Sequence, residues 1–259
     1  MIFAILQARV SSTRLPGKVL KPILGVPMLL RQIERIKRSK KIDSLLVATS
    51  TEESDDAIEH LCTSNAVPCF RGSLDNVLDR FYQAAVQYKP EHIVRLTGDC
   101  PLIDSEVIDK TIAYHLSGGY DYTSSALEPT FPDGMDVEVF TFDALVQARQ
   151  EAQLPSHKEH VTPFIYEQPG RFKLGSFKNT ENMVGLRWTV DEPEDFKLIT
   201  IIYETLYPEK HDFTMQDILR LVNARQELRT LNSQFIRNEG MIKSKQKDLE
   251  YLRNKGNHV

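Results

Sequence analysis

Short runs of apolar and β-branched residues alternate along the chain with stretches in which apolar residues recur every three or four positions. The short runs predict strands at 3–6, 45–48, 67–70, 92–96, 136–140, 172–177 and 186–190. The second pattern predicts amphipathic helices, for example over 29–36 and 77–85. This alternation indicates an α/β protein with a mostly parallel, Rossmann-like sheet and helices on both faces.

Three places have the composition of a helix start. Ser156 with Glu159, and Thr214 with Asp217, resemble capping boxes, in which two side chains cap the first turn reciprocally. Asp191 stands where an N-cap would stand before a helix that begins near residue 193. No internal repeat interrupts this organisation, so a single main domain over 1–223 is the simplest prediction.

After about residue 223 the chain becomes polar and basic and has no strand pattern. We predict a helical C-terminal extension over 224–259. Its residues Leu228, Leu231 and Phe235 lie at positions i, i+3 and i+7, which form one stripe of a helix and need a surface to cover them. That surface is either the body of the same chain or a second subunit of a homodimer, and the sequence leaves both open.

The composition is that of an ordinary soluble protein of 259 residues, with 41% hydrophobic and 26% charged residues. No apolar run approaches the ~20 residues that a transmembrane helix needs, and the N-terminus lacks a basic leader. Cys62, Cys69 and Cys100 form no C-x-x-C pair, as expected for reduced thiols. We therefore expect a cytoplasmic protein with no membrane contact, no disulfide framework and no zinc knuckle.

Positive charge is concentrated near the N-terminus. Residues 1–41 carry ten basic side chains against one acidic one, although the whole chain has a net charge of −4. Such a segment suits a polyanionic small ligand or nucleic acid, or it is a solvated helix face. The aromatic residues expected between the cations of a nucleic-acid surface are missing, so we expect no nucleic-acid partner.

The segment QARVSSTRLPGK at 7–18 directly follows the first predicted strand, where ligands of open α/β sheets bind. It supplies the cations Arg9, Arg14 and Lys18, three hydroxyl groups and a Pro-Gly turn, which together suit a triphosphate. Neither the P-loop spacing nor G-x-G-x-x-G is present. The alternative interpretation is a basic surface turn.

Two aspartates follow later strands, in LTGDCPL at 96–102 and RWTVDEPEDF at 187–196. Asp99, with Gly98 beside it to admit a ligand, and Asp191 are candidates for sharing one Mg²⁺ with substrate phosphates. The alternative role for each is a helix cap. Asp104 already fits the cap of the helix after Asp99, so Asp99 is left over, whereas for Asp191 both roles remain open.

Other polar residues are candidates for binding the remaining parts of a substrate. Arg71 and Ser73 follow the third predicted strand and could contact a base or ribose, or they could simply belong to a helix entry. Asp136 and Glu138 share one face of a predicted strand, and His160 lies on a helix. These three could bind sugar hydroxyls, or they could be ordinary structural residues.

The motifs QARVSSTRLPGKVLKPILGVPML, VRLTGDCPLID and RWTVDEPEDF, in this order, resemble the sugar-nucleotide cytidylyltransferases that activate ulosonic and acylneuraminic acids. PDGMDVEVF at 132–140, HKEHVTPFIY at 157–166 and RNEG at 237–240 resemble the branch of spore coat polysaccharide biosynthesis protein SpsF. The stretch 70–80 departs from the octulosonate enzymes, where a histidine and a threonine are expected. This departure argues against octulosonate as the sugar.

The resemblance implies a nucleotide-diphospho-sugar transferase-like fold and an enzyme that uses Mg²⁺ as cofactor. It would transfer CMP from CTP to an acidic sugar of the ulosonic acid type, release pyrophosphate and serve surface polysaccharide or glycan biosynthesis. Related synthetases are commonly homodimers. The alternatives are a sugar-1-phosphate nucleotidylyltransferase and a catalytically weak nucleotide-binding partner of a glycan pathway enzyme.

The resemblance implies that Arg9, Arg14 and Lys18 match the family's triphosphate-binding loop. It also implies that Asp99 and Asp191 match its metal-binding aspartates, whereas the other site residues are expected from their places in the chain. Arg9, Lys18, Asp99 and Asp191 are the expected catalytic residues, and Asp99 and Asp191 the expected metal ligands. The expected nucleotide-binding residues are Leu6, Ala8, Arg9, Ser12, Arg14, Lys18, Arg71, Ser73 and Asp99. The expected sugar-binding residues are Asp136, Glu138 and His160.

Overall fold

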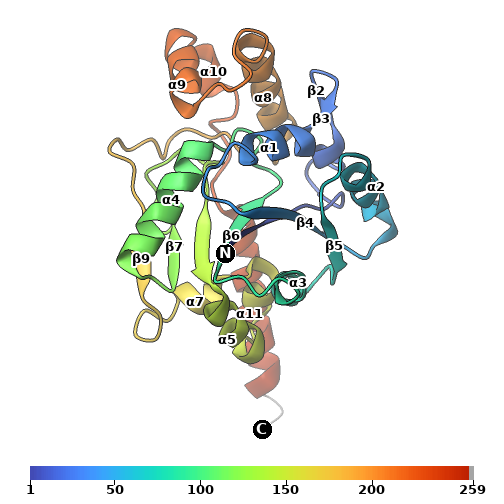
Figure 1. The fold of residues 1–259 in the computed structure, drawn as a ribbon, viewed down its shortest axis with the longest axis vertical. Coiled ribbons are helices and arrows are strands. Elements are labelled where there is room, and N and C mark those ends of the chain that lie inside the picture. The colour runs from blue at the N-terminus through green and yellow to red at the C-terminus, as the bar shows by residue number, and fades with distance from the viewer. Residues whose placement is uncertain (257–259) are drawn as a thin grey trace.

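A computed structural model describes residues 1–256, and its centre is a seven-stranded sheet in the order β5-β4-β1-β6-β8-β7-β9 (Figure 1). The strands of this sheet are β1 (Ile2–Gln7), β4 (Ser44–Ser50), β5 (Cys69–Gly72), β6 (His92–Thr97), β7 (Tyr122–Ser124), β8 (Glu138–Thr141) and β9 (Leu174–Ser176). A separate hairpin consists of β2 (Pro22–Ile23) and β3 (Val26–Pro27).

The sheet is mostly parallel, as the sequence predicts. β1 pairs in parallel with both β4 and β6, β4 with β5, and β7 with β9. Only β8 runs the other way, because it is antiparallel to β6 and to β7. The carboxyl ends of β1, β4, β5 and β6 therefore meet at one edge, where the α/β topology places a ligand.

Helices connect and cover the strands. They are α1 (Met28–Ile36), α2 (Asp56–Ser64), α3 (Val77–Val86), α4 (Ser105–Gly118), α5 (Phe142–Glu151), α6 (Pro155–His160), α7 (Pro163–Tyr166), α8 (Pro193–Leu206), α9 (Met215–Ala224), α10 (Glu227–Thr230) and α11 (Glu239–Gly256), with the 3₁₀ turns η1 (Lys18–Leu20) and η2 (Glu53–Asp55). None of these helices is both long and apolar enough to cross a membrane.

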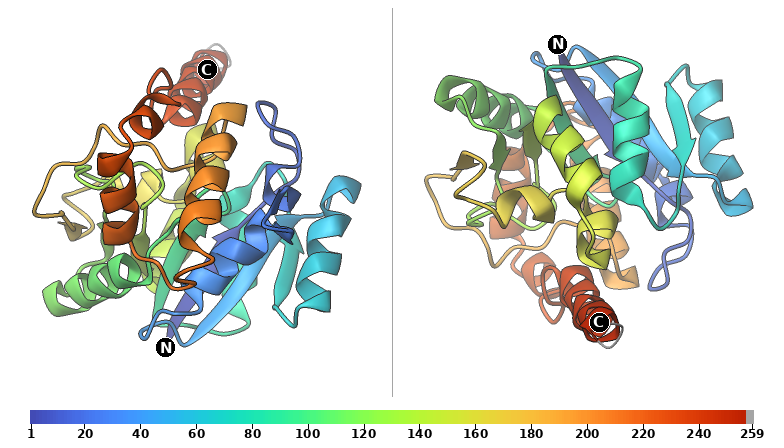
Figure 2. Two further views of the ribbon diagram at one scale, coloured as in Figure 1. Left: turned by 90° about the horizontal axis from the view of Figure 1, so that it is seen from above. Right: turned by 90° about the horizontal axis from the view of Figure 1, so that it is seen from below.

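The alternation of side chains along β1 produces two cores. Ala4 and Leu6 face a core shared with α1, α2, α4, α8 and α9, whereas Phe3 and Ile5 face a core shared with α3, α5 and α7. Figure 2 shows α1 and α8 on one side of the sheet and α3 and α5 on the other. Because each strand is covered on both faces, continuous apolar runs such as 3–6 form buried strands.

Six of the seven predicted strands overlap strands of the sheet, and the prediction at 186–190 is wrong. That segment is extended, but its backbone hydrogen bonds go to loops: Trp188 N donates to Asp133 O at 2.6 Å and Val190 N to Asp99 O at 2.7 Å. Conversely, β7 is only three residues long and has no apolar run that would have revealed it.

The two predicted capping boxes have different outcomes. Thr214 and Asp217 form the predicted reciprocal cap of α9. Ser156 and Glu159 do not cap α6, because the helix begins two residues earlier than this cap would place it, at Pro155, with Leu154 as its N-cap. The Ser156 backbone N–H instead donates to a carboxylate of α11.

The C-terminal extension packs on its own chain. Leu228 of α10 is 1% exposed and belongs to the core under α8 and α9. α11 lies along α6, where Ser244 Oγ is 2.8 Å from His160 Nε2 and Asp248 Oδ1 accepts from Ser156 N at 2.9 Å. The sequence left open whether the body of the same chain or a second subunit covers the extension. The body of the same chain covers Leu228.

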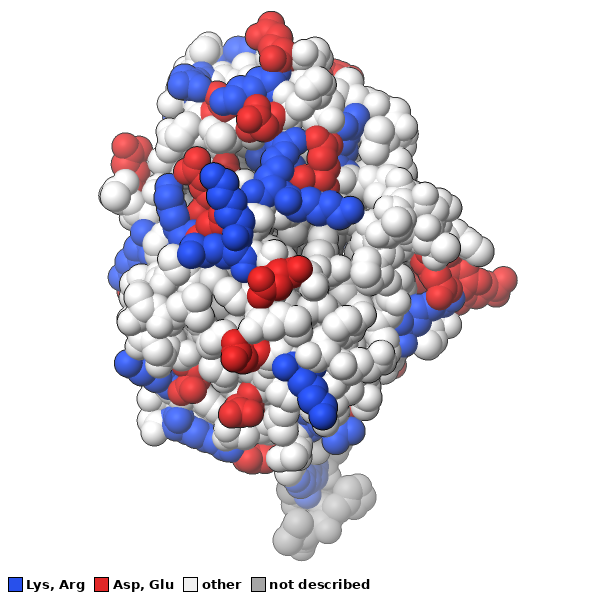
Figure 3. All heavy atoms as spheres, viewed as in Figure 1, with Lys and Arg blue, Asp and Glu red and all other residues white. Residues whose placement is uncertain are grey.

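The basic segment of residues 1–41 is interspersed with acidic partners. Arg31 and Arg38 of the α1 region both pair with Glu34, and the Lys40 backbone binds Asp109 of α4. On the face that Figure 3 shows, basic and acidic side chains lie side by side rather than forming a broad basic patch. The interpretation of residues 31–41 as a solvated helix face holds for the exposed Lys37, Lys40 and Lys41, but it is wrong for Arg31 and Arg35, which are buried.

Candidate active site

Lys18 brings the two predicted metal-binding aspartates together. Its Nζ lies 2.8 Å from Asp191 Oδ1 and 3.9 Å from Asp99 Oδ2, and it donates to the Val190 carbonyl at 2.6 Å. Asp99 follows β6, and Asp191 is held beside it because Val190 N donates to Asp99 O. Three residues that are distant in sequence thus form one charged cluster at the carboxyl edge of the sheet.

Two glycines allow this approach. Gly17 has φ +67°, in the left-handed region that favours glycine, and directly precedes the 3₁₀ turn that carries Lys18. Gly98 was expected to make room for a ligand. The structure corrects this, because a Cβ there would lie 3.0 Å from Gln7 O and 3.1 Å from Ala8 Cβ. Gly98 therefore allows the ends of β6 and β1 to pack closely.

Asp191 is not the helix cap. Glu192 occupies the N-cap position of α8, and Asp195 Oδ2 accepts hydrogen bonds from the backbone N–H groups of Glu192 and Asp191. Burial on its own would raise the pKa of Asp191, but the nearby charges of Lys18 and Arg14 outweigh burial and lower it. The Asp191 carboxylate is therefore ionised and does not cap the helix. Both properties are required of a metal ligand.

Asp104 caps α4, as predicted, by accepting a hydrogen bond from Glu106 N at 2.8 Å. Asp99 makes no such contact. Its side chain is 30% exposed, and its neighbours are the Lys18 ammonium and the Cys100 thiol, whose Sγ is 3.4 Å from Oδ1. The structure thus leaves the Asp99 carboxylate available for a ligand.

Arg14 lies at the same cluster. Its guanidinium pairs with Asp191 at 3.0 Å, with Glu192 at 3.4 Å and with Glu239 of α11 at 3.1 Å. Two of the three cations of the predicted triphosphate loop, Arg14 and Lys18, thus pair with Asp191. The sequence does not predict the link to Glu239, although Glu239 belongs to the RNEG motif at 237–240.

A buried arginine organises the acidic side of the cluster. Arg187 forms a bidentate pair with Asp195 at 2.9 Å and also contacts Asp133 at 3.0 Å and Asp191 at 3.2 Å. Burial opposes its charge, but the carboxylates outweigh burial and raise the pKa of Arg187. Asn232 of the C-terminal extension completes the arrangement by donating to Arg187 O and to Asp195.

Asp136, a predicted sugar-binding residue, pairs with an arginine of the extension. Arg237 Nη2 contacts Asp136 Oδ1 at 2.5 Å, Nε lies 3.7 Å from Asp133, and Nη1 donates to Phe131 O. Burial raises the pKa of Asp136 to about 7, the neighbouring Asp133 and Asp99 act in the same direction, and Arg237 opposes them. Sequence reasoning missed Arg237, whose only signal was the RNEG motif.

Four predicted site residues have partners elsewhere in the fold. Arg71 pairs with Asp56 and Glu59 of α2, and Ser73 Oγ accepts from Asn76 N. The partners of Glu138 are Arg95, Tyr122 Oη and Thr162 Oγ1, and His160 contacts Ser244. Their predicted roles in nucleotide or sugar binding stay predictions, but these contacts hold the side chains within the fold.

The remaining predicted nucleotide-binding residues lie at the end of β1 and in the loop that follows it. Leu6 and Ala8 are buried, Ala8 N donates to Ala48 O, and Ser12 Oγ accepts from Leu15 N. Arg9 is exposed, and within residues 1–256 its side chain makes neither an ion pair nor a hydrogen bond. It is thus free to meet an anion.

The carboxylates of Asp99 and Asp191, which both approach the Lys18 ammonium, form a donor set that fits a magnesium ion. Within the described residues, no group of three or more histidine, cysteine, aspartate or glutamate side chains is arranged to hold a metal ion. Mg²⁺, however, commonly binds through one or two carboxylates together with substrate phosphates. The shared approach of Asp99 and Asp191 to the Lys18 ammonium shows that both carboxylates can face one positive centre.

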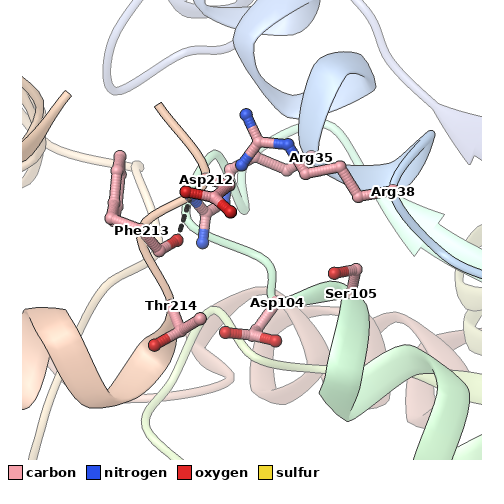
Figure 4. Close-up of a pocket in the computed structure, with 7 residues that line it drawn as sticks. All are labelled: Arg35, Arg38, Asp104, Ser105, Asp212, Phe213 and Thr214. Atoms are coloured by element: carbon pink, nitrogen blue, oxygen red, sulfur yellow. Dashed lines mark hydrogen bonds between the residues drawn. The ribbon is translucent and has the colours of Figure 1, made fainter. Parts of the chain in front are cut away.

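A small cavity of about 20 Å³ lies elsewhere, between α1, α4 and the start of α9 (Figure 4). Its lining residues are Arg35, Arg38, Asp104, Ser105, Asp212, Phe213 and Thr214. Arg35 Nη1 donates to Phe213 O at 3.0 Å there. The cavity has room for about one water molecule, so it is a packing feature and not a substrate site.

The chain belongs to the cytidylyltransferase family, whose profile matches residues 3–249. It is therefore an enzyme of the class that transfers the cytidylyl group of CTP, and the resemblance drawn from its motifs is confirmed. It is 40% identical to the uncharacterized protein MJ1063 of Methanocaldococcus jannaschii, over 90% of this chain and 94% of that protein. It is 35% identical to the spore coat polysaccharide biosynthesis protein SpsF of Bacillus subtilis, over 86% and 94% respectively.

A solved structure supports the same assignment. A cytidylyltransferase from Leptospira borgpetersenii matches with a TM-score of 0.84 and 32% sequence identity, covering 91% of this chain and 98% of that one. The fold expected from the sequence, a nucleotidyltransferase-like sheet with a helical C-terminal segment, is thereby confirmed.

Proposed function

We propose that the protein transfers CMP from CTP to an acidic sugar of the ulosonic acid type, with Mg²⁺ as cofactor, and releases pyrophosphate. The observation that carries this proposal is the meeting of Asp99, Asp191, Lys18 and Arg14 at the carboxyl edge of the sheet. The name of the SpsF relative supports a role in surface polysaccharide biosynthesis. The expected homodimer and cytoplasmic location belong to the same proposal.

In this reaction a sugar hydroxyl oxygen bonds to the α-phosphorus of CTP. The bond from that phosphorus to the oxygen bridging the α- and β-phosphates breaks, pyrophosphate leaves with this oxygen, and the hydroxyl proton passes to solvent. Such a transfer depends on positioning and on neutralising charge rather than on a covalent nucleophile. Arg14 and Lys18 supply cationic groups for the phosphates, and Asp99 and Asp191 would hold the metal. When bound, Mg²⁺ neutralises phosphate charge and lowers the pKa of the attacking hydroxyl.

The test is to incubate the purified protein with CTP, Mg²⁺ and either 3-deoxy-manno-octulosonate or N-acetylneuraminate, and to measure pyrophosphate and the CMP-sugar. We expect the two products in equal amounts and no reaction after chelation of the metal. A hexose 1-phosphate serves as the control substrate. Turnover with the hexose 1-phosphate and with neither acid would contradict the proposal and indicate a sugar-1-phosphate nucleotidylyltransferase.

A further inference from the structure

Arg80 is a buried arginine with an unpaired guanidinium. The residue is 2% exposed, and its Nε and Nη1 atoms are buried without a hydrogen-bond partner anywhere in the described chain. A buried donor that has lost its hydrogen bond to water and gained none in the protein lowers stability, and a buried cation lowers it more. A protein tolerates such a group where a ligand supplies the missing partner.

The other buried arginines of the described residues show how unusual this is. Arg31 and Arg35 each donate to two backbone carbonyls, and Arg187 is surrounded by carboxylates. Each of these arginines is also buried, yet each has its charge or its N–H groups satisfied. Arg80 differs from all three, so its lack of a partner is not a general property of buried arginines in this fold.

The position of Arg80 links it to the ligand edge of the sheet. It lies in the first turn of α3, and a Cβ added to Gly72, the last residue of β5, would be 3.0 Å from Arg80 Cγ. Arg9, which follows β1, and Asp55, which follows β4, are near enough for their charges to affect the pKa of Arg80. Arg80 thus packs against the carboxyl end of β5, and charged residues that follow β1 and β4 act on its guanidinium.

The charges around Arg80 do not compensate its own. Burial lowers the pKa of Arg80 to about 10, and the charge of Arg9 acts in the same direction, but the group stays protonated at neutral pH. Asp55 is the favourable neighbour, yet its carboxylate already accepts from Val10 N, Ser50 N and Ser50 Oγ. An excess of positive charge remains between Arg9 and Arg80.

We infer that Arg80 is a substrate-binding residue whose guanidinium takes an oxyanion: a phosphate of CTP or the carboxylate of the acidic sugar. The planar fork of an arginine matches both groups through two parallel hydrogen bonds. This inference rests on the proposed function for the identity of the anion, but not for the existence of an anion site. Arg9, exposed and without an ion pair among residues 1–256, is near enough to act on Arg80 electrostatically and belongs to the same site.

The inference predicts that stability and binding change in opposite directions. Arg80→Met replaces the unpaired cation with an apolar chain of similar length, so the protein without ligand should melt at the same or a higher temperature. Arg80→Lys keeps the charge but loses the fork. Arg149→Gln is the matched control, because Arg149 contacts α3 from outside through Asp79 and Tyr82.

Binding is measured by calorimetry with three probes: CTP, inorganic tripolyphosphate and N-acetylneuraminate. If Arg80 binds phosphate, Arg80→Met should weaken CTP and tripolyphosphate by about ten- to a hundredfold, with Arg80→Lys between it and the wild type. If Arg80 binds the carboxylate, only N-acetylneuraminate should weaken, or the KM for the acid should rise with the KM for CTP unchanged. The Arg149→Gln control should bind all three probes like the wild type.

Two results would overturn the inference. The first is unchanged binding of all three probes, with unchanged KM values, in both Arg80 variants. The second is a large drop in melting temperature of Arg80→Met together with wild-type binding by Arg80→Lys, which would mean that the guanidinium supports the fold. If the wild-type protein binds CTP but forms no CMP-sugar, the proposed function fails while the binding comparison at Arg80 can still be made.

Discussion

The two aspartates that share Lys18 depend on it unequally. Asp191 lies 2.8 Å from the ammonium, is 18% exposed and also pairs with Arg14 and Arg187, whereas Asp99 lies 3.9 Å away and is 30% exposed. Lys18 itself is only 11% exposed, so its charge needs a nearby carboxylate. Catalysis and stability should therefore respond differently to the loss of each aspartate.

Asp99→Asn is expected to lower turnover by roughly a hundredfold or more with little change in stability, because its carboxylate is available for the metal. Asp191→Asn should lose as much turnover and also about 1–3 kcal/mol of the free energy of unfolding, since it leaves Lys18 without its closest anion. Urea denaturation and the pyrophosphate assay measure the two effects. Asp75→Asn, at an exposed position, is the control, and wild-type turnover by Asp99→Asn would refute the metal assignment.

At the scale of residues, the sequence predicted the side chains that follow strand ends, because topology places those ends at one edge. Lys18 and Asp99 belong to this group. Asp191 was predicted to follow a strand that does not form, and the hydrogen bond from Val190 N to Asp99 O brings it to the same edge instead. Arg80 and Arg237 were missed, because composition does not distinguish a buried arginine from a surface one. Arg71 shows the reverse problem: it follows a strand end as well, yet acidic residues of α2 bind it.

Among the elements, α4 is joined to the sheet by two histidines in contact: His115, which is buried, and His92, which is partly exposed. His115 of α4 is fully buried, with Nε2 3.0 Å from His92 Nδ1 of β6 and Nδ1 3.0 Å from Thr123 Oγ1 of β7. Burial lowers the pKa of His115 to about 4, and the charge of His92 acts in the same direction. The α4 packing therefore requires the neutral ring.

This coupling predicts a loss of stability on acidification. As the pH falls below 6.5, the ordinary pKa of histidine, the unfolded chain takes up a proton that folded His115 does not take up until about pH 4. The free energy of unfolding should therefore fall by up to about 2 kcal/mol between pH 6.5 and 5 and be unaffected above that window.

Urea denaturation of the wild type and of His115→Asn at pH 7.5 and pH 5 measures this dependence. The variant should show a smaller difference between the two pH values than the wild type. His60→Asn, which changes an exposed histidine, is the control and should behave like the wild type. An equal pH dependence of His115→Asn and the wild type would contradict the assignment.

Element prediction succeeded where burial on both faces of the sheet produced long apolar runs, as in β1 and β6. It failed at 186–190, where Leu186, Trp188 and Val190 alternate with polar residues and are buried in the core, but the backbone hydrogen-bonds to residues 99 and 133 instead of to a strand. The spacing of apolar residues indicates which side chains are buried. It does not specify which other segment of the chain forms hydrogen bonds with the backbone of those residues.

For the molecule as a whole, the C-terminal extension is part of the site rather than an appendage. Arg237 pairs with Asp136, Glu239 pairs with Arg14, and Asn232 binds the backbone of Arg187. The boundary predicted at residue 223 marks a change in amino-acid composition. It does not separate the extension from the site, because residues on both sides of the boundary form the charged cluster. Contacts between residues so far apart leave no local pattern in a sequence.

Arg237→Gln should raise the KM for the acidic sugar by about tenfold or more, because Asp133 and Asp136 then repel an anion that approaches them. The KM for CTP should rise less, since Arg14 and Lys18 remain. Arg253→Gln is the control, as an exposed arginine of α11. Equal KM values for both substrates in Arg237→Gln and the wild type would exclude a role for the extension in sugar binding.

The contact between Arg14 and Glu239 spans 225 positions, so it also has a consequence in time. During synthesis the loop that carries Arg14 leaves the ribosome early, while its partner in α11 emerges more than two hundred residues later. A growing chain can form the β1-β4 pair long before it can close this cluster. Every nascent chain that stops short of residue 239 therefore lacks part of the charge arrangement, and only a chain that extends through it can assemble the whole site.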